Sequence, residues 1–477
     1  MLKNKFLTQN LIVLYLFCFF FTIKIEVFQA QSIGNQVTID SINIEGNTKT
    51  KEKVILRELT FKKGDSLDFK QLNAILEQNR LLLMNTGMFS SVTINIKNWN
   101  KNAIQLLIQI KEMFPFIPTG SLSFADRNFN IWWTEKNRDL KRLNYFAGLR
   151  FVNPTGNRDV FKASVQFGFG QKAELSYRLP NIGKKNQFGF YSNVYLSRYK
   201  EVWYATQNDS LLFYRDESNF LLKKFRASIG FSFRPKIRSI QYLRLQYNKD
   251  LTTEDVIKNK NSNFFAENQS KQQYLSAQYR YTLDYRNIRP YPTKGAFAAI
   301  EVEKQGFLPK DNVNALYGSL LYAQYFSLSK KISTELVAKA RYEFTRTRQP
   351  YYNIRAIGYG TDYLRGYEYY VIDGTDFAYL KSSLRYEFFN KKIDLGEFLP
   401  ENIRYIPFRA NLSLNNDFGK VQDSYNDKNN TFPNRWLWGK GIGLDFIIYY
   451  NVVFQLEYSV NHLNKGGFFV HIKTPFE

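Results

Sequence analysis

The chain has 477 residues, which is enough for a large domain and a small one. Phe, Tyr and Trp make up 17% of it, yet the mean hydropathy is negative, which argues against an ordinary soluble protein with an aromatic core. Interleaved aromatic and polar residues favour a barrel whose outer face meets lipid and whose interior meets water. The net charge of +24 is not gathered into a Lys- or Arg-rich tract, which argues against nucleic-acid binding and favours a basic interior and loops facing anionic lipid headgroups.

The N-terminal residues have the pattern of a signal peptide. Lys3 and Lys5 precede an apolar run over residues 11–21, which is too short to span a bilayer comfortably. Cleavage after Ala30 is predicted, which makes residues 1–30 the signal peptide; a membrane anchor is the alternative interpretation. Cys18 is the only cysteine and lies in this run, so the mature chain is predicted to contain no disulfide.

Residues 37–112 have the pattern of a small α/β domain. Alternating apolar residues predict a strand around residues 42–44, and a turn follows at residues 45–47. Asp68 and Gln71 form a capping-box start for a helix whose apolar residues recur on one face until Gly87. The predicted order is strand, helix (51–59), helix, strand (92–96), strand (104–110).

This order resembles a POTRA domain, the periplasmic module of outer-membrane assembly and transport proteins. The matching residues are Gly46-Asn-Thr-Lys-Thr50, Gly64 and Gly87-Met-Phe89. The resemblance implies a POTRA domain over residues 36–113, in which a sheet edge accepts an extended peptide by strand addition. An unrelated small α/β domain with the same apolar stripe is the alternative.

From the linker marked by Pro115 and Pro118 onward, the chain alternates apolar and polar residues. Residues 274–284 are typical, because Leu275, Ala277 and Tyr279 occupy one face and polar residues the other. Roughly sixteen such segments are separated by turn residues, within the even-numbered range of transmembrane β-barrels. The pattern predicts a mainly β chain with a transmembrane antiparallel β-barrel over residues 118–477; a soluble two-sheet sandwich is the alternative.

The stretch Gly358–Tyr367 contains Leu364, Arg365, Gly366 and Tyr367 between two alternating segments. A guanidinium stays charged, and its fork of donors suits a carboxylate. If this loop enters a confined space, Arg365 needs an acidic partner there. An exposed turn with a solvated arginine is the alternative.

Several motifs in the barrel segment resemble those of the BamA/TamA superfamily of bacterial surface antigens, whose barrels insert or export other outer-membrane proteins. They are Phe151-Val-Asn-Pro-Thr-Gly156, Tyr177-Arg-Leu-Pro180, Asp284-Tyr-Arg-Asn287, Tyr291-Pro-Thr-Lys-Gly295, Ser383-Leu-Arg-Tyr-Glu-Phe388 and Asn416-Asp-Phe-Gly419. Leu364-Arg-Gly-Tyr367 stands where the superfamily's sixth loop commonly has Val-Arg-Gly-Phe. The resemblance implies that this loop folds into the barrel and that Arg365 pairs with acidic residues on the strands that follow.

Strand parity identifies candidate partners for Arg365. If Leu384 and Tyr386 face lipid, Glu387 faces inward, and the same argument places Asp417 inward. Glu387 and Asp417 are therefore the predicted partners.

The resemblance also implies a weakly paired seam between the first strand, near Thr119, and the last strand, over about residues 467–476. A client strand adds to the edge that such a seam exposes. Gly466 with Gly467, and Gly439 with Gly441, suit a loose seam, or they are ordinary turn residues.

The sequence does not favour an enzyme. It has two histidines, His462 and His471, and a barrel phospholipase would need an inward serine–histidine pair, for which Ser459 is the candidate nearest in the strand pattern. No glycine-rich phosphate loop or metal-ligand cluster is evident, so no catalytic residue, metal site or cofactor is predicted.

The favoured function is a BamA/TamA-type assembly or translocation factor in the bacterial outer membrane, with a periplasmic POTRA domain that guides clients to the seam. The expected partners are unfolded outer-membrane or secreted proteins, outer-membrane lipids, and periplasmic or lipoprotein accessory subunits, with no nucleic acid. The alternatives are a two-partner secretion transporter, and a passive porin or structural outer-membrane protein.

Overall fold

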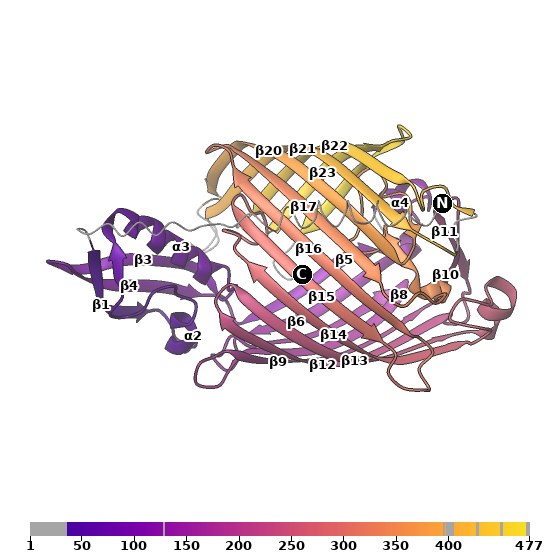
Figure 1. Cartoon of the computed structure of the whole chain (residues 1–477), viewed down its shortest axis with the longest axis horizontal. Helices are drawn as coiled ribbons and strands as arrows, with labels where there is room; N and C mark the ends of the chain where they lie inside the picture. Colours follow the sequence, from indigo (N-terminus) through magenta and orange to yellow (C-terminus); the bar gives the residue numbers. More distant parts are fainter. Residues whose placement is uncertain are drawn as a thin grey trace, which may run out of the picture.

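The structure is a computed structural model that describes residues 36–126, 129–394, 396, 405–425, 429–448 and 452–473. A small domain lies at one end of a large barrel (Figure 1). The predicted signal peptide, residues 1–30, lies outside the described residues. Across the described ranges, no helix is both long and apolar enough to cross a bilayer.

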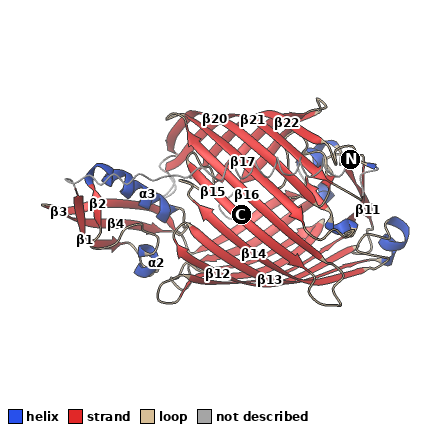
Figure 2. Cartoon of the chain, viewed as in Figure 1, coloured by secondary structure: helices blue, strands red, loops and turns tan. Residues whose placement is uncertain are grey.

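The small domain combines a four-stranded sheet with two α-helices (Figure 2). The strands lie in the order β2-β1-β4-β3, with β1 and β4 parallel and the other pairs antiparallel. The short strand β2 was not predicted, because three residues are too few for an alternating pattern. The elements are β1 (Gln36–Glu45), α2 (Glu52–Leu56), β2 (Ser66–Asp68), η1 (Phe69–Gln71), α3 (Leu72–Met84), β3 (Phe89–Asn100) and β4 (Ala103–Glu112).

The core of this domain lies between α3 and the sheet. Leu72, Leu76 and Leu83 on one face of α3 are buried in one cluster with the inward residues of β4. The Asp68 carboxylate accepts a hydrogen bond of 2.9 Å from the Lys70 N–H and so caps η1, which leads into α3. The predicted reciprocal cap by Gln71 does not form, because α3 begins one residue after it.

The barrel is a single sheet of sixteen strands, and all its described neighbours are antiparallel. This confirms the predicted fold class. The strands are β5 (Phe116–Phe124), β6 (Leu143–Val152), β7 (Val160–Gly168), β8 (Gly170–Ile182), β9 (Phe188–Tyr199), β12 (Leu222–Lys236), β13 (Ser239–Thr252), β14 (Lys271–Asp284), β15 (Gly295–Gln305), β16 (Ala315–Ser327), β17 (Ile332–Glu343), β20 (Asp376–Asp394), β21 (Tyr405–Gln422), β22 (Trp436–Ile448), β23 (Val452–Asn461) and β24 (Gly466–Lys473).

Loops at one end of the barrel carry the remaining elements. These are α4 (Phe129–Thr134), η2 (Leu140–Arg142), the hairpin β10 (Glu201–Gln207) and β11 (Ser210–Arg215), η3 (Val256–Lys260), η4 (Tyr351–Asn353), and the pair β18 (Arg355–Ile357) and β19 (Ile372–Asp373). We call this end the loop end. The opposite end, where short turns face the small domain, is the domain end (Figure 1).

Alternation along β20 shows how the sequence separates the two faces of the barrel. Leu380, Leu384 and Tyr386 are 44–46% exposed on the outer face, whereas Lys381, Ser383 and Arg385 between them are at most 9% exposed. Successive side chains in a strand point to opposite faces, so apolar residues cover the outside and polar residues fill the inside. Within the barrel, the Tyr291 hydroxyl after β14 donates a 2.6 Å hydrogen bond to Asp445 on β22.

The sheet has two ends, β5 and β24, and in the described residues neither strand pairs with the other. Pro118 lies within β5 and not in a linker as predicted. An end strand tolerates proline because one side of it needs no ladder hydrogen bond. The helix α4 contacts β24 near this opening.

Candidate functional site

The sixth loop, residues 344–375, connects β17 to β20 and folds into the barrel interior. Leu364 and Tyr367 are 0% and 1% exposed and belong to an apolar cluster that includes Phe377, Val421 and Leu437 of the barrel strands. The loop is therefore packed like a protein core. The alternative of an exposed turn with a solvated arginine is wrong, since Arg365 is 8% exposed.

Arg365 contacts two carboxylates from different strands. Its Nη1 donates a 2.8 Å hydrogen bond to Oδ1 of Asp417 on β21, and its backbone N–H donates to Oδ2 at 3.0 Å. Its Nε lies 3.1 Å from Oε2 of Glu457 on β23, an ion pair without a well-aligned hydrogen bond. Nη2 donates to the Ser383 hydroxyl of β20 at 3.1 Å. One side chain thus holds three strands to the loop.

The structure places Asp417 against Arg365 but gives the second position to Glu457, so the choice of Glu387 needs correction. Glu387 faces inward, as its parity predicts, but it lies four residues beyond Ser383 on β20, about 13 Å along the strand. Its carboxylate instead lies 3.9 Å from Arg409. Glu457 was not predicted as a partner. Its strand also alternates, so parity is compatible with both glutamates, and only the position of the loop along the barrel axis selects between them.

Gly366 allows the loop to lie against β23. Its φ is +80°, and a Cβ there would lie 2.5 Å from the carbonyl carbon of Val460. Its N–H donates to the Ser459 hydroxyl at 3.0 Å, and its carbonyl accepts from the Asn461 amide at 3.0 Å. Ser459, the serine considered for a hydrolase, therefore binds the loop backbone.

Tyr367 connects the loop to β22. Its hydroxyl accepts from the Trp438 N–H at 3.0 Å and also hydrogen-bonds with Nδ1 of His462. Gly439, which was considered a seam glycine, makes room for the loop, because a Cβ there would lie 1.9 Å from the Arg365 carbonyl oxygen. Sequence reasoning gave this glycine no such role.

The loop also contacts the last described strand, β24, through three side chains that the sequence analysis did not single out. The Tyr363 ring stacks on His471 with centroids 4.9 Å apart, and a Glu368 carboxylate oxygen lies 3.2 Å from His471 Nε2. The Tyr369 ring packs where a Cβ on Gly467 would lie, 2.5 Å from it. Gly467, from the pair Gly466 and Gly467, thus makes room for a loop contact on β24, an end strand of the sheet.

The small domain is held against the domain end of the barrel by a buried carboxylate. Glu58, 2% exposed, accepts hydrogen bonds from Arg234 of β12 at 2.7 Å and from Arg158 of the β6–β7 turn at 3.2 Å. Burial raises the pKa of Glu58, but the hydrogen bond and charge of Arg234, with the charges of Arg158 and Arg57, outweigh it and lower the pKa to about 2. The carboxylate is therefore ionised at neutral pH.

Two motifs of the sequence meet at the same junction. The turn at Gly46–Thr50 is capped by Glu112, which accepts from the Thr50 N–H at 2.6 Å. Beyond it, the Lys51 N–H donates to the Gly156 carbonyl at 3.1 Å, and the Asn153 amide donates to the Thr50 hydroxyl at 2.8 Å. A Cβ on Gly156 would lie 2.4 Å from the Lys49 carbonyl oxygen, so glycine is needed for this approach.

Comparison with known proteins agrees with this architecture. Residues 37–113 match the family model described as POTRA, surface antigen variable number repeat. A curated relative, the outer membrane protein assembly factor BamA of Nitratidesulfovibrio vulgaris (strain Hildenborough), is 27% identical over 164 residues, which cover 32% of this chain. That match spans 20% of the relative's length.

Two solved structures share the fold of nearly the whole chain. BamA from Haemophilus ducreyi lacking POTRA domains 1–3 has a TM-score of 0.52 at 16% identity, with 93% of this chain and 85% of that chain covered. CdiB from Escherichia coli has a TM-score of 0.55 at 12% identity, with 92% and 76% covered. The chain therefore combines a POTRA domain with a sixteen-stranded barrel, and in this arrangement it is similar in fold to BamA and CdiB.

Proposed function

We propose that this protein is an outer-membrane insertion or translocation factor that handles its clients at the opening between β5 and β24. The observation that carries the proposal is the sheet order, in which these strands are the two ends and are not paired with each other in the described residues. An unpaired strand edge is a template for another strand, because its N–H and C=O groups lack partners. In lipid, where water does not satisfy those groups, adding a client strand is especially favourable.

The sixth loop holds the strands on one side of this opening. Arg365 binds β20, β21 and β23, and Tyr363 and Tyr369 pack on β24. The proposed role of these contacts is to keep the β24 side in a fixed position while β5 moves. The POTRA domain, held beside the barrel by Glu58, would deliver clients from the periplasm.

The proposal includes a location in the outer membrane and a mechanism without covalent chemistry. The likeness to BamA and the apolar outer face of the barrel support a place in the outer membrane with the POTRA domain in the periplasm. The mechanism proposed requires no catalytic residue and no cofactor, because strand addition forms hydrogen bonds and breaks no covalent bond. The client proteins and any accessory subunits are recognised through main-chain pairing, which reads little sequence.

The test is reconstitution of the purified protein in liposomes, with a urea-unfolded outer-membrane barrel added as client. Client folding is followed by protease protection and by the gel shift that folded barrels show without heating. We expect faster folding than in empty liposomes, and folding slowed towards the empty-liposome rate with Arg365→Ala. Unaccelerated folding together with steady ion conductance would overturn the proposal in favour of a passive pore. Selective export of a soluble client without acceleration would instead support a secretion transporter.

A further inference from the structure

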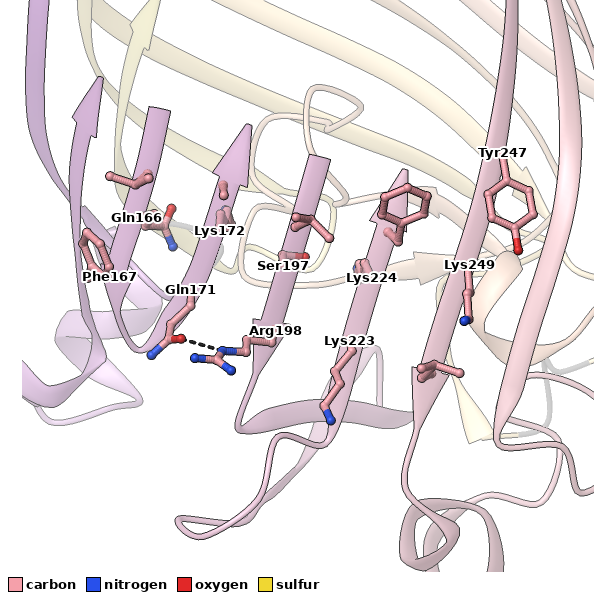
Figure 3. A pocket seen from close by; sticks show the side chains of 15 residues that line it. Gln166, Phe167, Gln171, Lys172, Ser197, Arg198, Lys223, Lys224, Tyr247 and Lys249 are labelled. Atoms are coloured by element: carbon pink, nitrogen blue, oxygen red, sulfur yellow. Dashed lines mark hydrogen bonds between the residues drawn. The ribbon is translucent and has the colours of Figure 1, made fainter. Parts of the chain in front are cut away.

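The outer wall of the barrel carries a groove of about 610 Å³ close to the loop end. It lies across β7, β8, β9, β12 and β13. Figure 3 shows its lining, with Gln171, Arg198 and Lys223 on three neighbouring strands near their ends.

Strand register places the basic residues of this groove on one face of the sheet. Gln171 pairs with Arg198, and Arg198 pairs with Lys223. Lys249 pairs with Phe225, two residues further along the same face. The neighbours of opposite parity, Ser197 and Asp250, are 7% and 0% exposed in the barrel interior. By alternation, Arg198, Lys223 and Lys249 therefore face outward.

These three cations have no ion-pair partner among the residues that the structure describes. Arg198 is held in place by other contacts, because its Nε donates a 2.6 Å hydrogen bond to Gln171 and its guanidinium lies 4.2 Å from the Phe220 ring centroid. By contrast, Lys224 points inward, where its ammonium lies 5.4 Å from the Trp203 ring centroid. The groove thus presents three outward positive charges that no carboxylate of the described residues neutralises.

On each strand, the outward residues become apolar towards the middle of the barrel. Leu196 and Val194 follow Arg198 on β9, and both are more than 40% exposed. On β12, Phe225 and then Ile229 follow Lys223. A cluster of cations at the membrane edge beside an apolar wall is complementary to an amphiphile with an anionic headgroup and acyl chains.

We propose that this groove binds a lipid with a phosphorylated headgroup, in the leaflet at the loop end of the barrel. Arg198, Lys223 and Lys249 contact the phosphates, Gln171 orients Arg198, and Leu196 and Phe225 contact the acyl chains. Three cations match a headgroup with at least two phosphate charges better than a singly charged one. The inference rests on the proposed membrane location, but it assumes nothing about clients or about the β5–β24 opening.

The experiment is native mass spectrometry of the full chain purified in a non-ionic detergent, with added diphosphoryl lipid A as the probe. Dephosphorylated lipid A of the same acylation, phosphatidylethanolamine and inorganic phosphate are the comparison ligands. We expect one diphosphoryl lipid to be retained, and the double variant Arg198→Gln/Lys223→Gln to bind it about 30-fold more weakly, because each cation near an anionic headgroup contributes roughly a fivefold factor.

The matched control is Lys420→Gln/Lys440→Gln. These lysines also lie on outward-facing rows near the loop end, but on β21 and β22 and over Trp436 and Trp438. Unchanged lipid affinity in this control would support binding in the groove. An equal loss of affinity in both double variants would show that only the net charge of the protein matters, and would overturn the proposed site. Equal binding of dephosphorylated lipid A, or competition by inorganic phosphate alone, would also overturn it. Failure of the liposome folding test would leave this result intact, since no client takes part.

Discussion

At the scale of single residues, the main feature is a permanently charged guanidinium inside the barrel. Arg365 is acceptable there because Asp417 and Glu457 supply negative charge from two strands and Ser383 accepts from it. Removal of one partner from such a group costs about 3–5 kcal/mol, more than the net contribution of the pair, because the other charges remain buried. Neutralising either Arg365 or one of its carboxylate partners is therefore expected to lower the free energy of unfolding strongly.

Glu457→Gln tests the identity of the second partner. We expect this change to lower the temperature at which the folded barrel loses its gel mobility shift, and to slow client folding, since it removes charge beside Arg365. Glu387→Gln is the matched control, because it is also an inward glutamate but lies near Arg409 at 3.9 Å. If the two variants lost equal stability, the assignment of Glu457 as the specific partner would be wrong.

Arg365→Ala tests the whole interaction. We expect the variant to insert as a barrel and to lose client folding activity. Its free energy of unfolding should fall by about 3–5 kcal/mol, so that it unfolds at a lower temperature. Arg365→Lys should recover only part of this, because an ammonium lacks the fork that reaches Asp417 and Ser383 together. Wild-type heat resistance and activity in Arg365→Ala would contradict the role given to the sixth loop.

The requirement for glycine at position 366 has its own test. Gly366→Ala introduces a Cβ 2.5 Å from Val460 at a φ of +80°, so we expect loss of the loop contacts and a lower unfolding temperature. Gly360→Ala is the control, since its φ is also positive, at +61°, but its Cβ would meet open space. The control should cost only about 1–2 kcal/mol from backbone strain. Equal unfolding temperatures would show that crowding at β23 is unimportant.

At the scale of elements, the POTRA domain and the barrel meet through a buried ionic cluster. Glu58→Gln should detach the domain, because Arg158 and Arg234 would then share a buried site without a countercharge. Pulsed electron paramagnetic resonance between spin labels at the exposed Lys97 and Lys330 would show a broader distance distribution. Glu77→Gln is the control within the same domain, since its ion pair with Arg80 is exposed and contributes little.

Docking of the POTRA domain on the barrel is expected to depend on pH through Glu58. The pKa of Glu58 is lowered from 4.5 to about 2 when the domain is docked, so its contribution is fully present above about pH 4.5. It is lost as the pH falls from there through 2, because the carboxylate must bind a proton. We expect the label distances of the wild type to broaden over this range, whereas Glu58→Gln should be broad throughout. A wild-type distribution unchanged at pH 2 would contradict the assignment.

At the scale of the whole molecule, the sheet order makes β5 and β24 the least constrained strands. In the part of the chain that the structure describes, each has a ladder partner on one side only, whereas β13 is paired with both β12 and β14. Hydrogen exchange of the protein in detergent should therefore be faster for amides of β5 and β24 than for those of β13. Equal protection would show that the opening is paired in solution and would remove the main support for client strand addition.

The direction of each strand residue was predictable from the sequence, whereas the contacts of the sixth loop were predictable only in part. Alternation in the barrel segment identified inward and outward residues correctly along β20, because period-two patterning is a local property of a strand. Parity likewise placed Asp417 and Glu387 inward. The choice between Glu387 and Glu457 was not predictable, since it depends on how deep the sixth loop lies along the barrel axis. The loop contacts of Gly439 and Gly467 depend on the same depth and lacked a local signal.

The sequence by itself determined the fold class, the order of the POTRA domain and the barrel, and the residue types on each face. It did so because hydrophobic periodicity, turn residues and the Leu364–Tyr367 motif are properties of neighbours along the chain. Only the tertiary structure decided which carboxylates neutralise Arg365, which arginines surround Glu58, and which outward cations share one groove. Those outcomes depend on strand register and on loop placement, which bring together residues up to 224 positions apart, as between Thr206 and Asn430.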